Sequence, residues 1–188
     1  QRMPVLRLGL LTLLITMAPS WGKTGWANQN DTRLDSLFSQ LQITGSRQKA
    51  RTIEKFIWKI WRESGDKSVD QLMVDGVKAM GGGNYEGALI AFSSIVKGAP
   101  NFAEGWNKRA TLYWLMGDFE NSVEDINRTL ALEPRHFGAL SGLAMIRESQ
   151  ERPLDALQAF ERALEIYPAM PNAAERIRKL NRQLGEPI

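Results

Sequence analysis

Residues 103–136 read AEGWNKRATLYWLMGDFENSVEDINRTLALEPRH, and this stretch decides the fold. Apolar residues recur in it at spacings of three and four, which is typical of helices that each bury one face. Gly117 and Asp118 lie between the two apolar patterns and predict a turn. Pro134 ends the second pattern, because proline has no backbone N–H and cannot continue a helix. The stretch therefore predicts two helices joined by a short turn.

The same layout occurs three times, and Pro100, Pro134 and Pro168 mark it at intervals of 34 residues. The fourth, eighth, twentieth and twenty-fourth places of each unit hold a large, a small, a small and a large residue. They are Leu72, Trp106 and Leu140; Gly76, Ala110 and Ala144; Ala88, Ser122 and Ala156; and Phe92, Ile126 and Phe160. Small residues let paired helices approach closely. A fixed period of this size predicts a stacked array with units at 69–102, 103–136 and 137–170.

The array resembles the tetratricopeptide repeat (TPR) family. The middle unit carries the resemblance best, at Trp106, Ala110, Tyr113, Gly117, Asp118 and Pro134. The resemblance covers residues 69–168 and implies an all-α fold, a right-handed α-solenoid of helix–turn–helix repeats. Asp75 and Arg109 depart from the pattern at the seventh place, and Arg147 departs from it at the eleventh. We hypothesise that Asp75 and Arg109 form an ion pair between the first two units.

Two segments flank the array. Residues 171–188 contain an amphipathic stretch with Ala174, Ile177 and Leu180 at helical spacing, which predicts a helix that caps the open end of the solenoid. Residues 28–68 predict a further helix pair. Its two apolar stripes are Leu34, Leu37, Phe38 and Leu41, then Ile53, Phe56, Ile57 and Ile60. We expect this pair to be a degenerate leading repeat, with no sheet anywhere in the chain.

Residues 1–27 have the order of a signal peptide. Arg2 and Arg7 precede the apolar run from Leu8 to Ala18, and Pro19, Ser20 and Gly22 follow it. We expect export, with cleavage after Ser20 or Ala27. The alternative is an uncleaved N-terminal anchor, although the run is shorter than the roughly 20 residues of a membrane span.

Charge and cysteine content bear on the compartment. The three basic residues of 1–27 account for the net charge of +3, so the remainder is balanced and gives no reason to expect nucleic-acid binding. The chain has no cysteine, which excludes disulfides and suits a bacterial periplasm. The chain is similar to a group of exported alphaproteobacterial repeat proteins with no assigned activity. The resemblance lies in the leader and in the stretches WNKRATLY and EPRHFGALSGLAMI. The alternative is a protein anchored in the inner membrane and facing the periplasm.

The sequence gives little sign of catalysis. His136 is the only histidine, and we expect it to hydrogen-bond a helix end. Gly81–Gly83 has no Gly-Lys-Ser/Thr after it, so it predicts a turn and no phosphate loop. Residues 55–62, KFIWKIWR, fit a buried helix with Lys55, Lys59 and Arg62 in solvent. They also fit a membrane-surface helix or a base-stacking platform. We therefore expect no enzyme, no metal and no cofactor.

The family resemblance implies a binding groove on the first helices of the units. Its expected residues are Met73, Val77 and Met80; Asn107, Thr111 and Trp114; and Ser141, Met145 and Glu148. Methionines give an adaptable apolar surface, and Trp114 is the expected anchor, unless the leading helix pair packs over the groove and buries it. Some family members clamp acidic C-termini with several cations. The matching places here hold Met73, Val77, Lys108, Gly138 and Gly142, which is one cation, so we expect no such clamp.

The sequence thus predicts a non-catalytic scaffold that binds a protein or peptide in the bacterial cell envelope. The alternative is a membrane-tethered assembly factor, held by an uncleaved leader and by the helix with Trp58 and Trp61. A membrane contact is expected only in that case.

Overall fold

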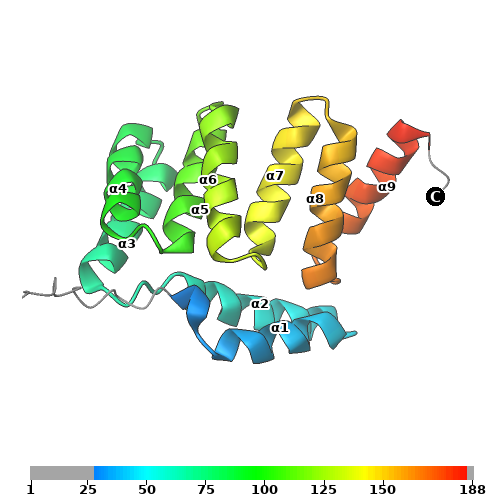
Figure 1. Cartoon of the computed structure of the whole chain (residues 1–188), viewed down its shortest axis with the longest axis horizontal. Helices are drawn as coiled ribbons and strands as arrows, with labels where there is room; N and C mark the ends of the chain where they lie inside the picture. The colour runs from blue at the N-terminus through cyan, green and yellow to red at the C-terminus, as the bar shows by residue number, and fades with distance from the viewer. Residues whose placement is uncertain (1–27, 186–188) are drawn as a thin grey trace, which may run out of the picture.

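The computed structural model describes residues 28–185, and every regular element within them is helical (Figure 1). The predicted leader, 1–27, lies outside the described residues. The elements are η1 Asn28–Asn30, α1 Arg33–Ile43, α2 Arg47–Trp61, α3 Lys67–Gly81, α4 Tyr85–Gly98, α5 Ala103–Leu115, α6 Phe119–Leu132, α7 Phe137–Ser149, α8 Pro153–Ile166 and α9 Ala173–Leu184.

The three predicted units are the helix pairs α3–α4, α5–α6 and α7–α8, and their packing follows the alternation of large and small residues. Gly76 faces Phe92 so closely that a Cβ on the glycine would lie 2.5 Å from the ring. Ala88 and Ala156 are fully buried at the equivalent small places of the second helices. The solenoid fold therefore follows from the fit between paired helices.

The turns inside the units show why glycine recurs there. Gly83 and Gly117 both have φ of 77°, a left-handed conformation that costs glycine little. Asn84 and Asp118 follow them and cap α4 and α6, accepting hydrogen bonds from Gly87 N and Asn121 N. In the turn of the third unit, Glu151 takes the left-handed conformation, with φ of 57°, and Pro153 is the first residue of α8. Gly82 and Gly83 thus form an inter-helix turn, as predicted, and Gly81 is the last residue of α3.

The expected cap lies against the last unit, where α9 packs on α8. Ala173 and Leu180 are buried in its contact face, and Ile177 packs with them. Ala174, predicted to be part of the stripe, points to solvent instead. The stripe therefore keeps Ile177 and Leu180 as predicted, and Ala173 takes the place of Ala174.

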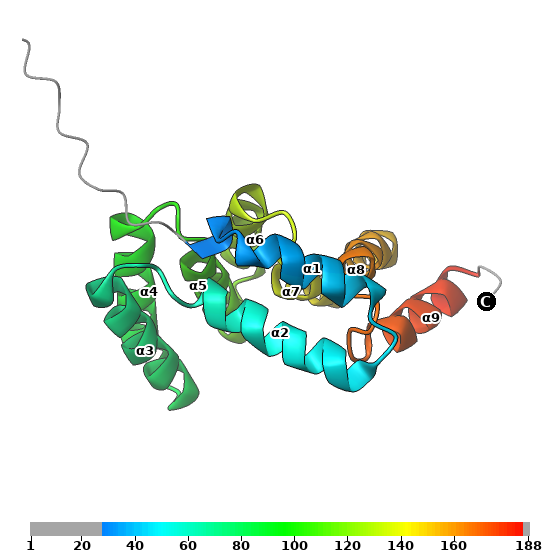
Figure 2. The same cartoon turned by 90° about the horizontal axis from the view of Figure 1, so that it is seen from below.

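The helix pair α1–α2 does not stack as a leading repeat, and this prediction is wrong. It lies across the array, along the edge formed by the turns between units (Figures 1 and 2). Asp35 binds Arg135 at 2.7 Å, and Gln42 donates a hydrogen bond to the carbonyl of Glu165 at 3.1 Å. The helix pair therefore contacts the second and third units from the side. It does not continue the solenoid as an additional repeat.

The faces of α2 also differ from the predicted stripe. Ile57, Ile60 and Trp61 are buried against Phe137 and Tyr167, whereas Phe56 is 54% exposed. Lys59 and Arg62 lie on the solvent side, as predicted. The buried face of α2 thus keeps Ile57 and Ile60 and adds Trp61, with Trp58 half-buried beside it, and both indole rings pack against Phe137.

Candidate functional site

The first helices of the units, α3, α5 and α7, form the inner row of the array, and successive members contact each other (Figure 2). Between α5 and α7 this row contains a cavity of about 140 Å³. Thr111 and Trp114 of α5 line it from one side, and Gly142 and Met145 of α7 line it from the other. Gly142 leaves room there, because its nearest side-chain neighbour is 3.7 Å from a built Cβ.

Four of the nine predicted groove residues line this cavity, namely Asn107, Thr111, Trp114 and Met145. Trp114 is 38% exposed, so α1–α2 does not bury it. The soft sulfur side chain of Met145 faces the same space as the indole. This combination of a rigid aromatic and an adaptable thioether suits an apolar side chain of a partner.

The other five predicted residues lie elsewhere. Met73 is 4% exposed within the core of the first unit, so its place in the groove is wrong. Met80 packs against the same core, and Val77 is exposed away from the cavity. Glu148 is occupied by Arg176 of the capping helix. Ser141 is half-buried outside the cavity lining. The site is therefore confined to the second and third units.

Below the cavity lies a buried polar cluster that sequence reasoning missed. The carboxylate of Glu104 meets Nε2 of His136 at 3.1 Å, the ammonium of Lys108 at 3.1 Å and the amide of Asn107 at 2.8 Å. Burial works to raise the pKa of Glu104, yet Lys108, with His136 and Asn107, holds it below its ordinary value. Asn107 thus uses one of its amide hydrogens to hold Glu104.

His136 caps a helix, as predicted, and also joins three elements. Its Nδ1 accepts a hydrogen bond from the backbone N–H of Ala139 at 3.1 Å, which fixes the start of α7. Its ring stacks on Trp61 with centroids 4.1 Å apart. Its other nitrogen faces Glu104 of α5. The histidine is therefore a fully buried structural contact between α2, α5 and α7.

Trp58 of α2 closes one end of the inner face. A Cβ on Gly138, which also lines the cavity, would lie 2.7 Å from the Trp58 ring. The Lys108 ammonium lies 5.5 Å from the same ring and 3.1 Å from Glu104. The one cation at the matching clamp places is therefore already engaged. Trp61 is buried and Trp58 is half-buried against α7, so the two tryptophans of residues 55–62 pack within the fold, as the buried-helix reading expects.

The hypothesised pair of Asp75 and Arg109 does not form. Arg109 instead binds Asp125 of α6 with two nitrogens, at 2.7 and 2.9 Å. Asp75 accepts a hydrogen bond from Gln71 in its own helix. Burial raises the pKa of Asp125 in spite of the guanidinium beside it. The polar residue at the seventh place thus pairs within its own unit.

Two negative observations concern the described residues alone. Within residues 28–185 no group of three metal-ligating side chains is gathered. No helix in this part of the chain has both the length and the apolar character needed to cross a membrane.

The model of a family described as tetratricopeptide repeat matches residues 107–171. A TPR repeat-containing protein of Rhizobium etli is 40% identical over 153 residues, which is 81% of this chain and 75% of the relative. The small glutamine-rich tetratricopeptide repeat-containing protein 2 of Saccharomyces cerevisiae is 25% identical over 77% of this chain but only 42% of its own length.

Solved structures show the same fold. The first TPR domain of Spaghetti (RPAP3), bound to an HSP90 peptide, superposes with a TM-score of 0.60 and 24% identity over 63% of this chain and 94% of that one. MamA superposes with a TM-score of 0.59 and 19% identity over 76% of this chain and 86% of that one. TPR domains typically serve as interaction scaffolds. The three helix pairs, their 34-residue period and the extent of the match to the Rhizobium relative show that this chain belongs to the tetratricopeptide repeat family.

Proposed function

We propose that this protein is a non-catalytic scaffold that binds a protein or peptide partner through the cavity between α5 and α7. The observation that carries the proposal is Trp114, which is 38% exposed at a cavity of about 140 Å³ that Met145 and Gly142 also line. A large aromatic side chain held at a concavity is the usual anchor of a protein interface.

The size of the cavity indicates one inserted side chain, with the rest of the partner on the inner row. Thr111 donates its hydroxyl proton to the carbonyl of Asn107, so the wall is mainly apolar where the partner would enter. Met145 can change rotamer to follow the shape of the inserted group. We therefore expect a partner with an exposed leucine, methionine or aromatic residue.

Binding of an acidic C-terminal peptide by a clamp of cations suits this chain poorly. The related TPR domains whose structures hold HSP90 or HSP70 peptides set the precedent for peptide binding. Here Gly138 and Gly142 stand at two of the clamp places, and Lys108 is bound to Glu104. The apolar anchor is therefore the better basis for recognition.

The compartment is part of the proposal. We infer export to the periplasm from residues 1–27, with anchoring in the inner membrane as the alternative. N-terminal sequencing of the protein from its host tests this, since a mature start after Ser20 or Ala27 means cleavage. An intact leader in the membrane fraction means an anchor.

An affinity capture from an envelope extract tests the site. The wild type is compared with Trp114→Ala/Met145→Ala and with Leu115→Ala, a control at a 40% exposed side chain outside the cavity lining. A partner retained by the wild type and the control but lost by the double variant supports the proposal. Equal retention by all three contradicts it.

A further inference from the structure

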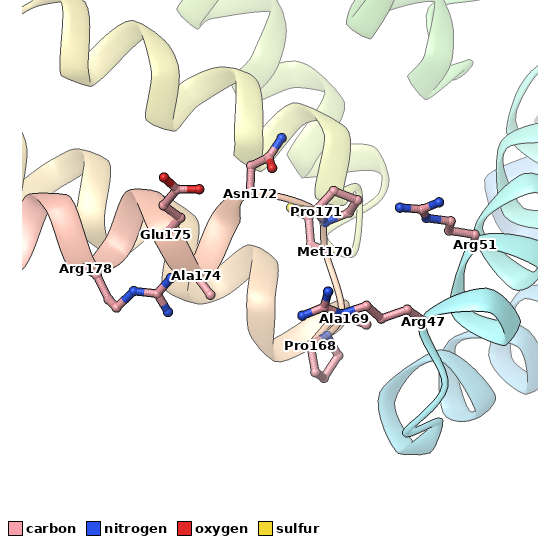
Figure 3. Close-up of a pocket in the computed structure, with 10 residues that line it drawn as sticks. All are labelled: Arg47, Arg51, Pro168, Ala169, Met170, Pro171, Asn172, Ala174, Glu175 and Arg178. Carbon is pink, nitrogen blue, oxygen red and sulfur yellow. The ribbon is translucent and has the colours of Figure 1, made fainter.

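A second cavity, of about 390 Å³, lies where the crosswise helix pair meets the capping helix (Figure 3). Arg47 and Arg51 extend from α2 toward the segment 168–172, and Arg178 reaches the same region from α9. Its volume falls within the range of ordinary ligand sites. It is built from parts of the chain outside the repeat groove, so it is separate from the cavity at Trp114.

The charges of this cavity are unbalanced. Three arginines face it against one carboxylate, that of Glu175. Within residues 28–185 none of the three is in an ion pair, in contrast with Arg109 and Arg135, which bind the buried carboxylates of Asp125 and Glu133. Planar guanidinium groups bind carboxylate oxygens in pairs, so this group is well suited to an anionic ligand.

Two helix starts add to the positive potential. The first turns of α2 and α9 both line the cavity, and the N-terminal end of a helix carries a partial positive charge. Ser46 caps α2 by accepting from the N–H of Lys49, but Asn172 makes no such bond at α9. The first amides of α9 are therefore available as additional donors beside Arg178.

The basic surface continues along α2, which indicates the shape of the ligand. An adjoining hollow of about 550 Å³ shares Arg47 and Arg51 and adds Lys55. These three cations lie four residues apart and so form one row on the helix. Pro168, Met170 and Pro171 supply an apolar floor at the end of the row. A single compact anion would reach only part of this surface.

We propose that this basic cleft, formed by Arg47, Arg51, Lys55 and Arg178, binds an acidic peptide segment in extended conformation. In an extended chain alternate side chains point the same way, so carboxylates at every second residue can meet the row of cations. The small apolar residues that alternate with the carboxylates of the peptide face Pro168, Pro171 and Met170. The ligand would bridge α2 and α9 and hold the helix pair against the cap.

The test is a fluorescence-anisotropy titration of the full chain with a labelled peptide of alternating glutamate and alanine. Binding should weaken as salt is raised. Arg51→Gln/Arg178→Gln should weaken it about tenfold, because two charge-assisted contacts are lost. Glu175→Gln should strengthen it, since the only opposing carboxylate of the cleft is removed. Trp114→Ala should leave the affinity unchanged, which separates this site from the proposed groove.

Lys97→Gln is the matched control, because Lys97 is an exposed cation of α4, far from the cleft. The substituted arginines are exposed, so circular dichroism should show the variants folded. The proposal is overturned if the glutamine version of the peptide binds equally well, if Lys97→Gln weakens binding as much as the arginine variant, or if no binding is detected. It is also overturned if inorganic phosphate displaces the peptide at concentrations near the peptide's own Kd, which would indicate a site for small anions.

Discussion

Nε2 of His136 lies 3.1 Å from Oε2 of Glu104, with both side chains completely buried. His136 begins α7, Glu104 lies in the first turn of α5, and Trp61 of α2 stacks on the histidine ring. The pair therefore holds two successive units and the crosswise helix pair together at one point. A buried polar pair of this kind stabilises the fold only while both partners are present.

The first prediction concerns pH. The pKa of Glu104 is lowered from 4.5, chiefly by Lys108 and His136 acting against burial, so its contribution to stability is present above that pH. It is lost as the pH falls through the lower folded-state value. Glu104→Gln should lower the free energy of unfolding by about 3 kcal/mol at neutral pH. Urea unfolding should also show less acid destabilisation in this variant than in the wild type below pH 4.5. If the variant and the wild type lose the same amount of stability as the pH is lowered, the role of Glu104 is contradicted.

The second prediction compares two glycines of α7. Gly138→Ala places a Cβ 2.7 Å from the Trp58 ring, so the indole or α2 must shift, and stability should fall by about 1–3 kcal/mol. Gly142→Ala meets its nearest side chain at 3.7 Å and should be neutral or stabilising by up to about 1 kcal/mol. Thermal unfolding of the two variants checks the difference. Equal effects would mean that Trp58 does not pack against α7 as described.

The third prediction uses tyrosine ionisation. Burial, and then the carboxylate of Glu54, raise the pKa of Tyr167 to about 12 from 10.0. A spectrophotometric titration should show one of the three tyrosines ionising near pH 12, and Tyr167→Phe should remove that step. The neutral phenol is favoured in the folded state, so its stabilising effect is present below pH 10 and is lost between pH 10 and 12.

Tyr167→Phe should also cost about 1 kcal/mol at neutral pH, because the hydroxyl donates to Glu54 at 3.1 Å between the array and α2. If the late ionisation step persists in the variant, the shifted tyrosine is another one.

The fourth prediction concerns Arg109 and Asp125. Arg109→Ala leaves a carboxylate that is 3% exposed without its partner, so unfolding should become easier by about 3–5 kcal/mol. Arg109→Met/Asp125→Leu removes both charges and should recover most of the loss. A double-mutant cycle by chemical denaturation measures the coupling. Additive effects of the two substitutions would contradict the pair.

The repeat could be predicted from the sequence because its period constrains local structure. Pro100, Pro134 and Pro168 each stand two residues after an observed second helix, which ends at Gly98, Leu132 or Ile166. The fit of Gly76 against Phe92 was also visible, since both occupy fixed places in the unit. These features depend on residues within one helix pair.

The arrangement of α1–α2 could not be predicted in the same way. An apolar stripe shows that a helix buries one face, but it does not show what covers that face. The pairing of Glu104 with His136 joins residues 32 positions apart, and only the side-by-side starts of α5 and α7 bring them together. The place of Met73 could not be predicted for a related reason, because it is buried in a cluster that includes Phe92 of its own unit and Leu112 of the next.

The affinity of the captured partner, or of its minimal binding peptide, for the wild type and for Trp114→Ala tests the central claim most directly. Trp114 is exposed at its cavity, so the fold should be unaffected and only binding should change. The account predicts a loss of at least about 2 kcal/mol in binding free energy, roughly thirtyfold in Kd, by isothermal titration calorimetry. A Kd within about twofold of the wild-type value would contradict it and would place the partner on another face of the array.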